Sequence, residues 1–403
     1  MALNAPPTAL ADPGIPSRCF VIDEGKLIEN AAILDDIQKR SGAKILMALK
    51  AFAAWDSFPL LSRAFAGPLY GTCASSVDEA RLGKEKFGGE VHAFAAAWEE
   101  GETRELLSLA DHIVFNSAEQ WRRFRPLIDQ ANSTFRADNP VKAGLRINPE
   151  HSEGATAIYN PCSPGSRLGI RPGQFEKISD FSGISGLHFH TLCEQNAGPL
   201  ARTLEAVGKK FPIRRGFYQW FNFGGGHHIT RADYDRVLLV NLINDWRRKY
   251  GGTIYLEPGE AVALDAGWLT ATVLDIVEAD LPVAILDVSA ACHMPDVLEM
   301  PYIPDVWLAK DGNFEKASGE DGHRYRLAGK SCLAGDVVGE YGFKKNLKPG
   351  DRFVFGDMAI YSMVKTNTFN GLRLPSIGAL APDGEKFRMI KEFGYEDFRD
   401  RLS

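Results

Sequence analysis

The chain has 403 residues, of which 45% are hydrophobic and 24% charged, an ordinary composition for a globular protein with room for two or three domains. The 46 basic and 52 acidic side chains give a net charge of −6, and the sequence has no basic block. The charges therefore give no reason to expect nucleic acid or an anionic membrane as a partner. We therefore expect small-molecule chemistry.

The N-terminal segment and the cysteines indicate the compartment. The start, MALNAPPTALADPGIPS, lacks a basic region followed by an apolar one, and no apolar run approaches the ~18 residues that a membrane span needs. The six cysteines form no CxxC pair or regular framework, as expected of free thiols in a reducing compartment. These features predict a cytoplasmic protein.

After a first β-rich run, CFVIDEGKL, a pattern of β-rich run, loop and polar helical stretch repeats to about residue 260. Ser76 with Glu79 and Ser117 with Gln120 have the spacing of capping boxes at two helix starts. The eight runs are KILMALK (44–50), LYGTCAS (69–75), EVHAFA (90–95), HIVFNS (112–117), AGLRINP (143–149), ISGLHFH (184–190), QWFNFGGG (219–226) and TIYLEPGE (253–260).

This alternation predicts the fold class. Near-continuous apolar strands between helices indicate a parallel sheet covered on both faces, and eight units favour a closed (β/α)8 barrel over residues 27–265. An open doubly wound sheet is the alternative. After residue 265 the short β-rich runs are separated by Gly, Pro and Asp, which predicts an antiparallel β domain formed by residues 266–403 together with 1–26.

Several chemically notable residues fall at the carboxyl ends of the predicted strands, where the active sites of such barrels lie. Singly, each has a simpler interpretation: Lys50 could be the first exposed residue after a strand, and three glycines could form a tight turn. Their shared position on one rim favours a site. The residues are Lys50, Ser75, Arg146, His190, Gly224 to Gly226, and Glu257 to Glu260.

The residue types at this rim suit a phosphorylated cofactor with a pyridine ring. Glycine N–H groups can hold a phosphate, Glu257 can pair with a protonated ring nitrogen, and a lysine amine can form a covalent bond to an aldehyde. His188 and His190 lie two apart on one strand, so a metal pair and a metal hydrolase are a further alternative. Because no recognised metal spacing connects them to His227 and His228, we expect no metal.

The order of these elements resembles the fold-type III pyridoxal-phosphate family, which includes ornithine and diaminopimelate decarboxylases and alanine racemase. The matching motifs extend over nearly the whole chain: ALKAF, HFH, GGG, EPG, KSCLAGD and MAIY. The resemblance implies pyridoxal 5'-phosphate and the following roles: Lys50 forms the Schiff base, His190 stacks on the ring, Gly224, Gly225 and Gly226 hold the phosphate, Glu257 keeps the ring nitrogen protonated, and Tyr361 reaches the phosphate.

The same resemblance implies a homodimer with two shared active sites, because Cys332 would enter the site from the partner subunit as a proton donor. Arg146 would lie near the phenolic oxygen of the cofactor. The sequence does not fix the order of any oligomer above a dimer.

Two departures from the ornithine and diaminopimelate enzymes point to a different substrate. Glu260 follows EPG where those enzymes usually carry arginine, and Leu333 follows the cysteine where they carry an acid. The loop CHMPDVLEMPY adds further carboxylates, which in isolation would more often be solvated surface. Together with Glu260, the acids Asp296, Glu299 and Asp336 predict a pocket for a polyamine with several ammonium groups.

The segments HFHTLCEQN and CHMPDVLEMPY closely resemble those of the carboxynorspermidine/carboxyspermidine decarboxylases. This resemblance implies removal of the α-carboxylate to give norspermidine or spermidine in polyamine biosynthesis. The alternatives are a decarboxylase of diaminopimelate, ornithine or arginine, an amino-acid racemase, and a non-catalytic pyridoxal-phosphate carrier. The two triamines differ by one methylene, typically about 1–3 kcal/mol in a pocket, so the sequence does not fix the preference.

Overall fold

The computed structural model describes residues 5–154, 160–319 and 322–403. They divide into two compact units, Asn30–Val262 and the combination of Met1–Glu29 with Ala263–Ser403. The predicted barrel, 27–265, differs from the first unit by three residues at each end. Both boundaries fall inside helices, α1 (Glu24–Ser41) and α9 (Glu260–Ala263), which explains why a change in strand pattern could not place them.

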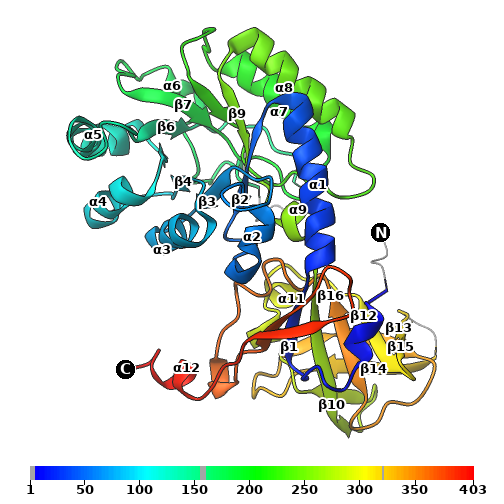
Figure 1. The fold of residues 1–403 in the computed structure, drawn as a ribbon. Coiled ribbons are helices and arrows are strands. Elements are labelled where there is room, and N and C mark those ends of the chain that lie inside the picture. The colour runs from blue at the N-terminus through cyan, green and yellow to red at the C-terminus, as the bar shows by residue number, and fades with distance from the viewer. Residues whose placement is uncertain (1–4, 155–159, 320–321) are drawn as a thin grey trace. The chain divides into compact units, whose positions relative to one another are not determined.

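All eight predicted runs form strands of one closed barrel, in which each strand pairs in parallel with its neighbours in chain order (Figure 1). The prediction of a (β/α)8 barrel is confirmed, and the open sheet is excluded. The strands are β2 (Lys44–Ala48), β3 (Gly71–Ala74), β4 (Glu90–Phe94), β5 (His112–Phe115), β6 (Lys142–Arg146), β7 (Ile184–His188), β8 (Trp220–Asn222) and β9 (Thr253–Leu256).

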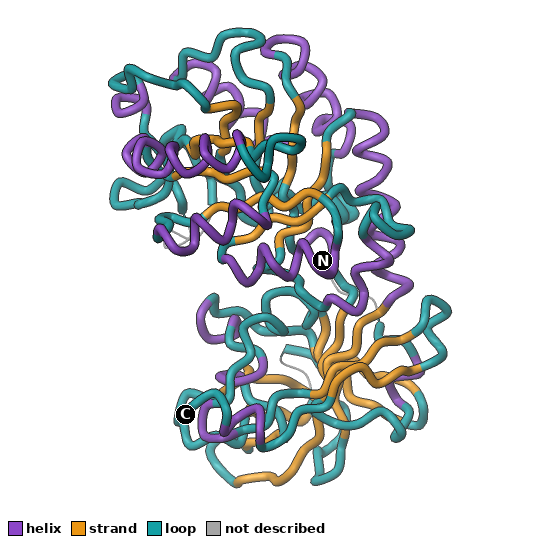
Figure 2. Tube along the Cα trace, turned by 60° about the vertical axis from the view of Figure 1, so that its left-hand side comes forward, coloured by secondary structure: helices purple, strands orange, loops and turns teal. Residues whose placement is uncertain are grey.

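Helical segments alternate with these strands, as Figure 2 shows in purple. Ser76 and Ser117 cap two of the helices by accepting hydrogen bonds from the N–H groups of Glu79 and Gln120. Beyond α1 and α9, the segments are η2 (Trp55–Ser57), α2 (Phe58–Leu61), α3 (Val77–Leu82), η3 (Gly83–Phe87), α4 (Glu100–Leu109), α5 (Ala118–Ser133), α6 (Pro172–Phe175), α7 (Ala197–Lys210) and α8 (Arg236–Tyr250).

The second hydrogen bond of each predicted capping box, from the N–H of the capping serine to the side chain three residues on, is not formed. The Glu79 carboxylate accepts from the N–H of Ser75 instead of Ser76, and the Gln120 amide donates to the carbonyl of Ala96. Glu79 has its partner in the loop before its own helix and Gln120 has its partner in the loop after β4, which the spacing alone did not reveal.

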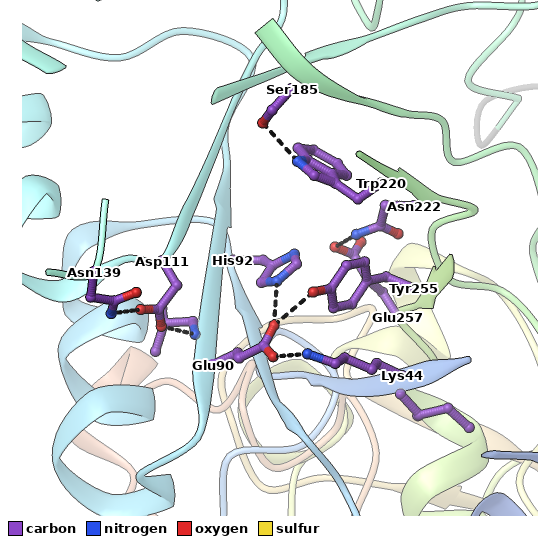
Figure 3. A network of polar contacts seen from close by, with 12 residues as sticks. Lys44, Glu90, His92, Asp111, Asn139, Ser185, Trp220, Asn222, Tyr255 and Glu257 are labelled. Carbon is purple, nitrogen blue, oxygen red and sulfur yellow. Dashed lines mark hydrogen bonds and ion pairs between the residues drawn. The ribbon is translucent and has the colours of Figure 1, made fainter. Parts of the chain in front are cut away.

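Trp220 fills the middle of the barrel because two neighbouring strands carry glycine beside it. A Cβ on Gly144 would lie 2.3 Å from the Trp220 ring, and a Cβ on Gly186 would lie 2.0 Å from it. The indole Nε1 donates to the Ser185 hydroxyl at 2.9 Å (Figure 3). Leu46 and Val114 pack in the same cluster, so the barrel interior is a closed core and not a channel.

A polar network lies at the amino ends of the strands, where Glu90 is the common acceptor (Figure 3). Its carboxylate accepts from the Lys44 ammonium, from the Tyr255 hydroxyl at 2.9 Å and from His92 Nε2 at 3.4 Å. Burial alone raises the pKa of Glu90, but the hydrogen bonds from His92 and Lys44 outweigh it and lower the pKa to about 2. Glu90 is therefore ionised in the folded protein at neutral pH.

We expect Glu90→Gln to destabilise the barrel by about 1–3 kcal/mol at neutral pH, because it leaves Lys44 without its charged acceptor. The folded pKa, about 2, lies below the ordinary value of 4.5, so the contribution is fully present above about pH 4.5 and is lost as the pH falls toward 2. Urea unfolding of both proteins at neutral pH and near pH 3 measures the difference, which should shrink on acidification. Glu105→Gln, which removes an exposed partner of Arg81, should have little effect at either pH.

The second unit is a ten-stranded sheet, and the prediction that it is antiparallel is wrong in part. The first strand, β1, pairs in parallel with β17, and β11 pairs in parallel with β14. These partners are far apart in the chain, so no hairpin turn fixes their direction. The strands are β1 (Cys19–Asp23), β10 (Gly267–Val277), β11 (Val283–Leu286), β12 (Val306–Lys310), β13 (Asn313–Lys316), β14 (His323–Ala328), β15 (Val337–Phe343), β16 (Arg352–Gly356), β17 (Ser376–Leu380) and β18 (Phe387–Lys391).

The helical segments of this unit are short, as its Gly- and Pro-rich sequence predicts. They are η1 (Thr8–Ala11), α10 (Ala290–His293), α11 (Asp296–Glu299), η5 (Phe369–Gly371) and α12 (Glu396–Arg399). All six cysteines of the chain are free thiols. Within the described ranges, no helix combines the length and apolar character that a membrane crossing requires.

Candidate active site at the carboxyl ends of the barrel strands

Lys50 lies in a turn two residues beyond β2 and is exposed, as the simpler interpretation of the sequence predicts. Its ammonium nevertheless lies close to groups from other strand ends. Burial, followed by the charges of Lys50 and Arg146, holds the pKa of His190 well below its usual range. The Lys50 charge also opposes the effect of burial, which raises the pKa of the Cys73 thiol and of Glu79. Lys50 therefore belongs to a cluster at the barrel rim.

His190 follows β7 and presents a neutral imidazole. Its Nδ1 accepts a hydrogen bond from the N–H of Gly225 at 2.7 Å, so that nitrogen carries no proton. The neutral form agrees with the low pKa that burial produces. Arg146, which is buried, donates from Nη2 to the His190 carbonyl at 3.3 Å. The ring is thus held by the glycine turn, and the backbone of His190 is held by Arg146.

The three glycines after β8 are required by close packing. Gly224 and Gly226 have φ values of +72° and +79°, and a Cβ on Gly226 would lie 2.1 Å from the carbonyl oxygen of Leu192. The N–H of Gly224 donates to Asn222 Oδ1 at 2.9 Å, and the N–H of Gly225 donates to His190. These two N–H groups are engaged inside the protein. The predicted contact between a backbone N–H group and the phosphate therefore falls to Gly226, the remaining glycine of the turn.

Glu257 follows β9 and its carboxylate is enclosed, with 11% of the side chain exposed. One oxygen accepts from Asn222 Nδ2 at 2.6 Å and the other lies 3.3 Å from His188 Nε2 (Figure 3 labels Asn222 and Glu257). Burial raises the pKa of Glu257, but the interactions with His188 and Asn222 outweigh it and lower the pKa to about 2. The site therefore holds a buried carboxylate that is ionised at neutral pH.

These side chains fit pyridoxal phosphate. An ionised carboxylate suits a protonated pyridine nitrogen, a neutral imidazole suits the face of a ring, and a lysine amine at the rim suits an aldehyde. Glu257, His190 and Lys50 supply these groups within one unit.

Glu260 stands in the first turn of α9 with 17% of its side chain exposed, and its carboxylate lies 3.2 Å from His228 Nε2. The sequence suggested a carboxylate that faces a cationic part of the substrate. The structure shows that an imidazole already accompanies it, so any ammonium group bound there would share Glu260 with His228.

In the second unit, Cys332 is exposed in the loop between β14 and β15. Its N–H donates to Asn370 Oδ1 at 2.8 Å. Asp336 is buried, and its carboxylate accepts from the hydroxyls of Ser289 at 2.9 Å and Ser331 at 2.6 Å. Asp336 was predicted to contact the substrate. Its buried position and its hydrogen bonds instead favour a structural role, in which it fixes the loop that carries Cys332.

Asp296 and Glu299 bracket α11 and share one ammonium group, that of Lys365. The Glu299 contact measures 2.7 Å, and Lys365 Nζ also lies 5.9 Å from the ring centroid of Tyr361. The two acids can therefore bind an ammonium group, as the sequence suggested, but the ammonium that they hold in this structure belongs to the chain itself.

The metal alternative receives no support from these contacts. His188 points its Nε2 to Glu257, while His190 uses Nδ1 for Gly225. Among the described residues, Glu90, His92 and His112 are the one group of three potential ligands, with atoms within 4.8 Å. The two imidazoles are stacked at 3.8 Å and 17°, so their in-plane lone pairs cannot converge on one ion.

Sequence reasoning missed Asn222 and the role of His188. Asn222 lies between two phenylalanines in a buried strand, and a polar residue at an inward position of such a strand was the available signal. The same signal, Glu90 and His92 two apart in EVHAFA, marks the network at the other end of the barrel.

Comparisons with known proteins place this site in context. Residues 19–359 match the family described as pyridoxal-dependent decarboxylase, C-terminal sheet domain. The chain is 42% identical over 389 residues to a carboxynorspermidine/carboxyspermidine decarboxylase of Campylobacter jejuni, covering 95% of this chain and 98% of the relative. It is also 42% identical over 390 residues to a carboxyaminopropylagmatine decarboxylase of Synechocystis, covering 96% of each protein.

A solved structure resembles the chain over both units. The crystal structure of carboxynorspermidine decarboxylase from Campylobacter jejuni, complexed with norspermidine, has a TM-score of 0.83 and 41% sequence identity. The similarity covers 95% of this chain and 99% of that protein.

Proposed function

The chain belongs to the pyridoxal-dependent decarboxylases, and we propose that it removes the α-carboxylate of carboxynorspermidine or carboxyspermidine, releasing carbon dioxide and norspermidine or spermidine. The observation that carries this substrate class is the 42% identity, over 95% of the chain, to a decarboxylase of that name. A non-catalytic cofactor carrier is disfavoured because the family match continues through the second unit to residue 359.

A second candidate substrate is carboxyaminopropylagmatine. A decarboxylase named for it has the same identity to this chain, 42%. Its tail ends in a guanidinium group, whereas the tails of the two carboxylated triamines end in an ammonium group. Both tails are cationic, so the carboxylates of Glu260, Asp296 and Glu299 are suited to either.

The cofactor would be held at the barrel rim by residues of the first unit. Lys50 would bind it covalently, His190 would cover one face of the ring, and Glu257 would accept a hydrogen bond from the ring nitrogen. Pyridoxal phosphate, when bound, supplies an electron sink for the pair released as the carboxylate departs. The turn that ends at Gly226 is a candidate for the phosphate, and the role of Tyr361, a residue of the second unit, stays a prediction from the resemblance.

Glu257 contributes by staying ionised, since a carboxylate with a pKa near 2 stabilises positive charge on the ring nitrogen. We further propose a homodimer in which Cys332 of a second copy donates a proton from Sγ to the α-carbon after carbon dioxide leaves. The exposure of Cys332 and the fixing of its loop by Asp336 support this assignment.

Product analysis tests the proposed function. Purified protein is supplied with carboxynorspermidine, carboxyspermidine, carboxyaminopropylagmatine, diaminopimelate, ornithine and arginine, each with and without pyridoxal phosphate. We expect carbon dioxide and the matching polyamine from a carboxylated polyamine, and only with the cofactor present. Turnover confined to the simple amino acids would contradict the proposal.

We expect Glu260→Gln to raise KM for the polyamine by about tenfold while pyridoxal phosphate stays bound, because the variant loses a charged acceptor for the tail and not for the ring. Steady-state kinetics and a cofactor titration measure the two effects separately. Glu205→Gln, an exposed acid that pairs with Lys209 on α7, is the matched control. Loss of cofactor by Glu260→Gln would show that Glu260 has been assigned to the wrong ligand.

A further inference from the structure

Two side chains outside the predicted site enclose the Glu257 carboxylate, and we propose that Asn222 and His188 are positioning residues that hold it for the ring nitrogen of the cofactor. The inference rests on the proposed function, because it assumes that pyridoxal phosphate lies beside Glu257.

Asn222 connects Glu257 to the glycine turn. Its Oδ1 accepts from the N–H of Gly224 at 2.9 Å, so its Nδ2 must face the other way, where it donates to Glu257 Oε1 at 2.6 Å. The Glu257 backbone N–H also donates to the Gly224 carbonyl at 2.8 Å. Asn222 is fully buried. The orientation of its amide is therefore set by the backbone, and the turn fixes Glu257 through two separate hydrogen bonds.

His188 holds the second oxygen. Its Nε2 lies 3.3 Å from Glu257 Oε2, and because a carboxylate only accepts, the proton lies on Nε2. Burial lowers the pKa of His188, which keeps the ring neutral. Its Nδ1 is buried and has no hydrogen-bond partner among the described residues. A buried acceptor without a partner lowers the stability of the fold. We therefore explain the placement of the His188 ring by the hydrogen bond that its Nε2 donates to Glu257.

The carboxylate of Glu257 can still accept a further hydrogen bond beside those from Asn222 and His188. Asn222 and His188 each occupy one acceptor position of the carboxylate, and the Cys73 thiol lies against it as a third donor, so about one of its four acceptor positions is left. A protonated ring nitrogen requires one such position. Asn222 and His188 thus orient the carboxylate without saturating it, and neither of them needs to touch the cofactor.

The test compares two ligands that differ by one atom. Apoprotein is titrated with pyridoxal phosphate and with the analogue in which a carbon replaces the pyridine nitrogen, and binding is followed by protein fluorescence. We expect Asn222→Ala and His188→Leu each to weaken binding of pyridoxal phosphate by about tenfold or more. Binding of the analogue should change much less, because it makes no hydrogen bond to Glu257.

Conservative variants and a control sharpen the result. His188→Gln keeps an N–H donor in a similar place and should restore most of the affinity. Asn222→Asp keeps the shape and the acceptor for Gly224 but sets a second carboxylate against Glu257, so it should weaken binding even if Asn222→Ala fails to fold. Asn132→Ala removes an amide that bridges the N–H and carbonyl of Val141, and should leave both affinities unchanged.

Equal weakening of both ligands by Asn222→Ala or Asn222→Asp and by His188→Leu would overturn the inference, because the two side chains would then act on the fold or on the phosphate. If the unaltered protein binds neither ligand, the proposed function is what fails, and the inference is rejected with it.

Discussion

Replacing Lys50 by alanine is expected to lower kcat by about 10³-fold or more and to abolish the visible absorbance of the protein loaded with pyridoxal phosphate. Lys50 lies two residues past β2, near His190 and Cys73. The variant loses the amine that would form the covalent bond to the cofactor. Assays of product formation measure kcat, and an absorbance spectrum measures the visible band.

A lysine elsewhere in the barrel provides the control. Lys142 begins β6 and is exposed at the opposite end of the strands, so Lys142→Ala should retain both absorbance and turnover. If Lys50→Ala kept the visible absorbance and full activity, the assignment of the covalent lysine would be wrong, whatever the substrate.

Replacing Glu257 by glutamine is expected to lower kcat by about 10²-fold or more, with a smaller effect on KM, because a neutral amide cannot stabilise positive charge on the ring nitrogen. The carboxylate has a pKa of about 2, so it is ionised at every pH at which the enzyme would be assayed. The loss should therefore be independent of pH between about 5 and 9.

The local contacts suggest that the amide can be accommodated. Its oxygen can accept from Asn222, and its NH2 group can face His188, whose proton can move to Nδ1. We expect the thermal unfolding temperature to change little, since both neighbours keep a partner. Unchanged kcat in a folded Glu257→Gln protein would contradict the role of this carboxylate.

The pattern of strands and helices was readable from the sequence because it depends on local periodicity. Strands such as β2 and β5 are buried runs with one polar residue each, and the alternation with helices allows few closed arrangements. The parallel pairing of β1 with β17 could not be predicted, because it joins residues 357 positions apart, for example Cys19 and Ser376.

The candidate site divides in the same way. Lys50, His190 and Glu257 were predicted because each lies within two residues of the carboxyl end of a strand, and the sequence pattern locates those ends. The partners of Glu257 were not found, because Asn222 lies 35 residues away and meets it only through the pairing of β8 with β9. The surroundings of Asp336 were not predictable either, because the Ser289 hydroxyl that donates to its carboxylate comes from a distant helix start.

The parallel pairing of β1 with β17 has a consequence for synthesis of the chain. β1 leaves the ribosome before the barrel segment, but its neighbours β10 and β17 follow only after the whole barrel has been made. The barrel, which is one continuous segment, can fold while the nascent chain is still being extended. Until β10 and β17 have been made, the two edges of β1 have no partner strand, and such edges are prone to aggregate. Ribosomes that stall between β10 and β17 should therefore release a folded barrel attached to an aggregation-prone remnant.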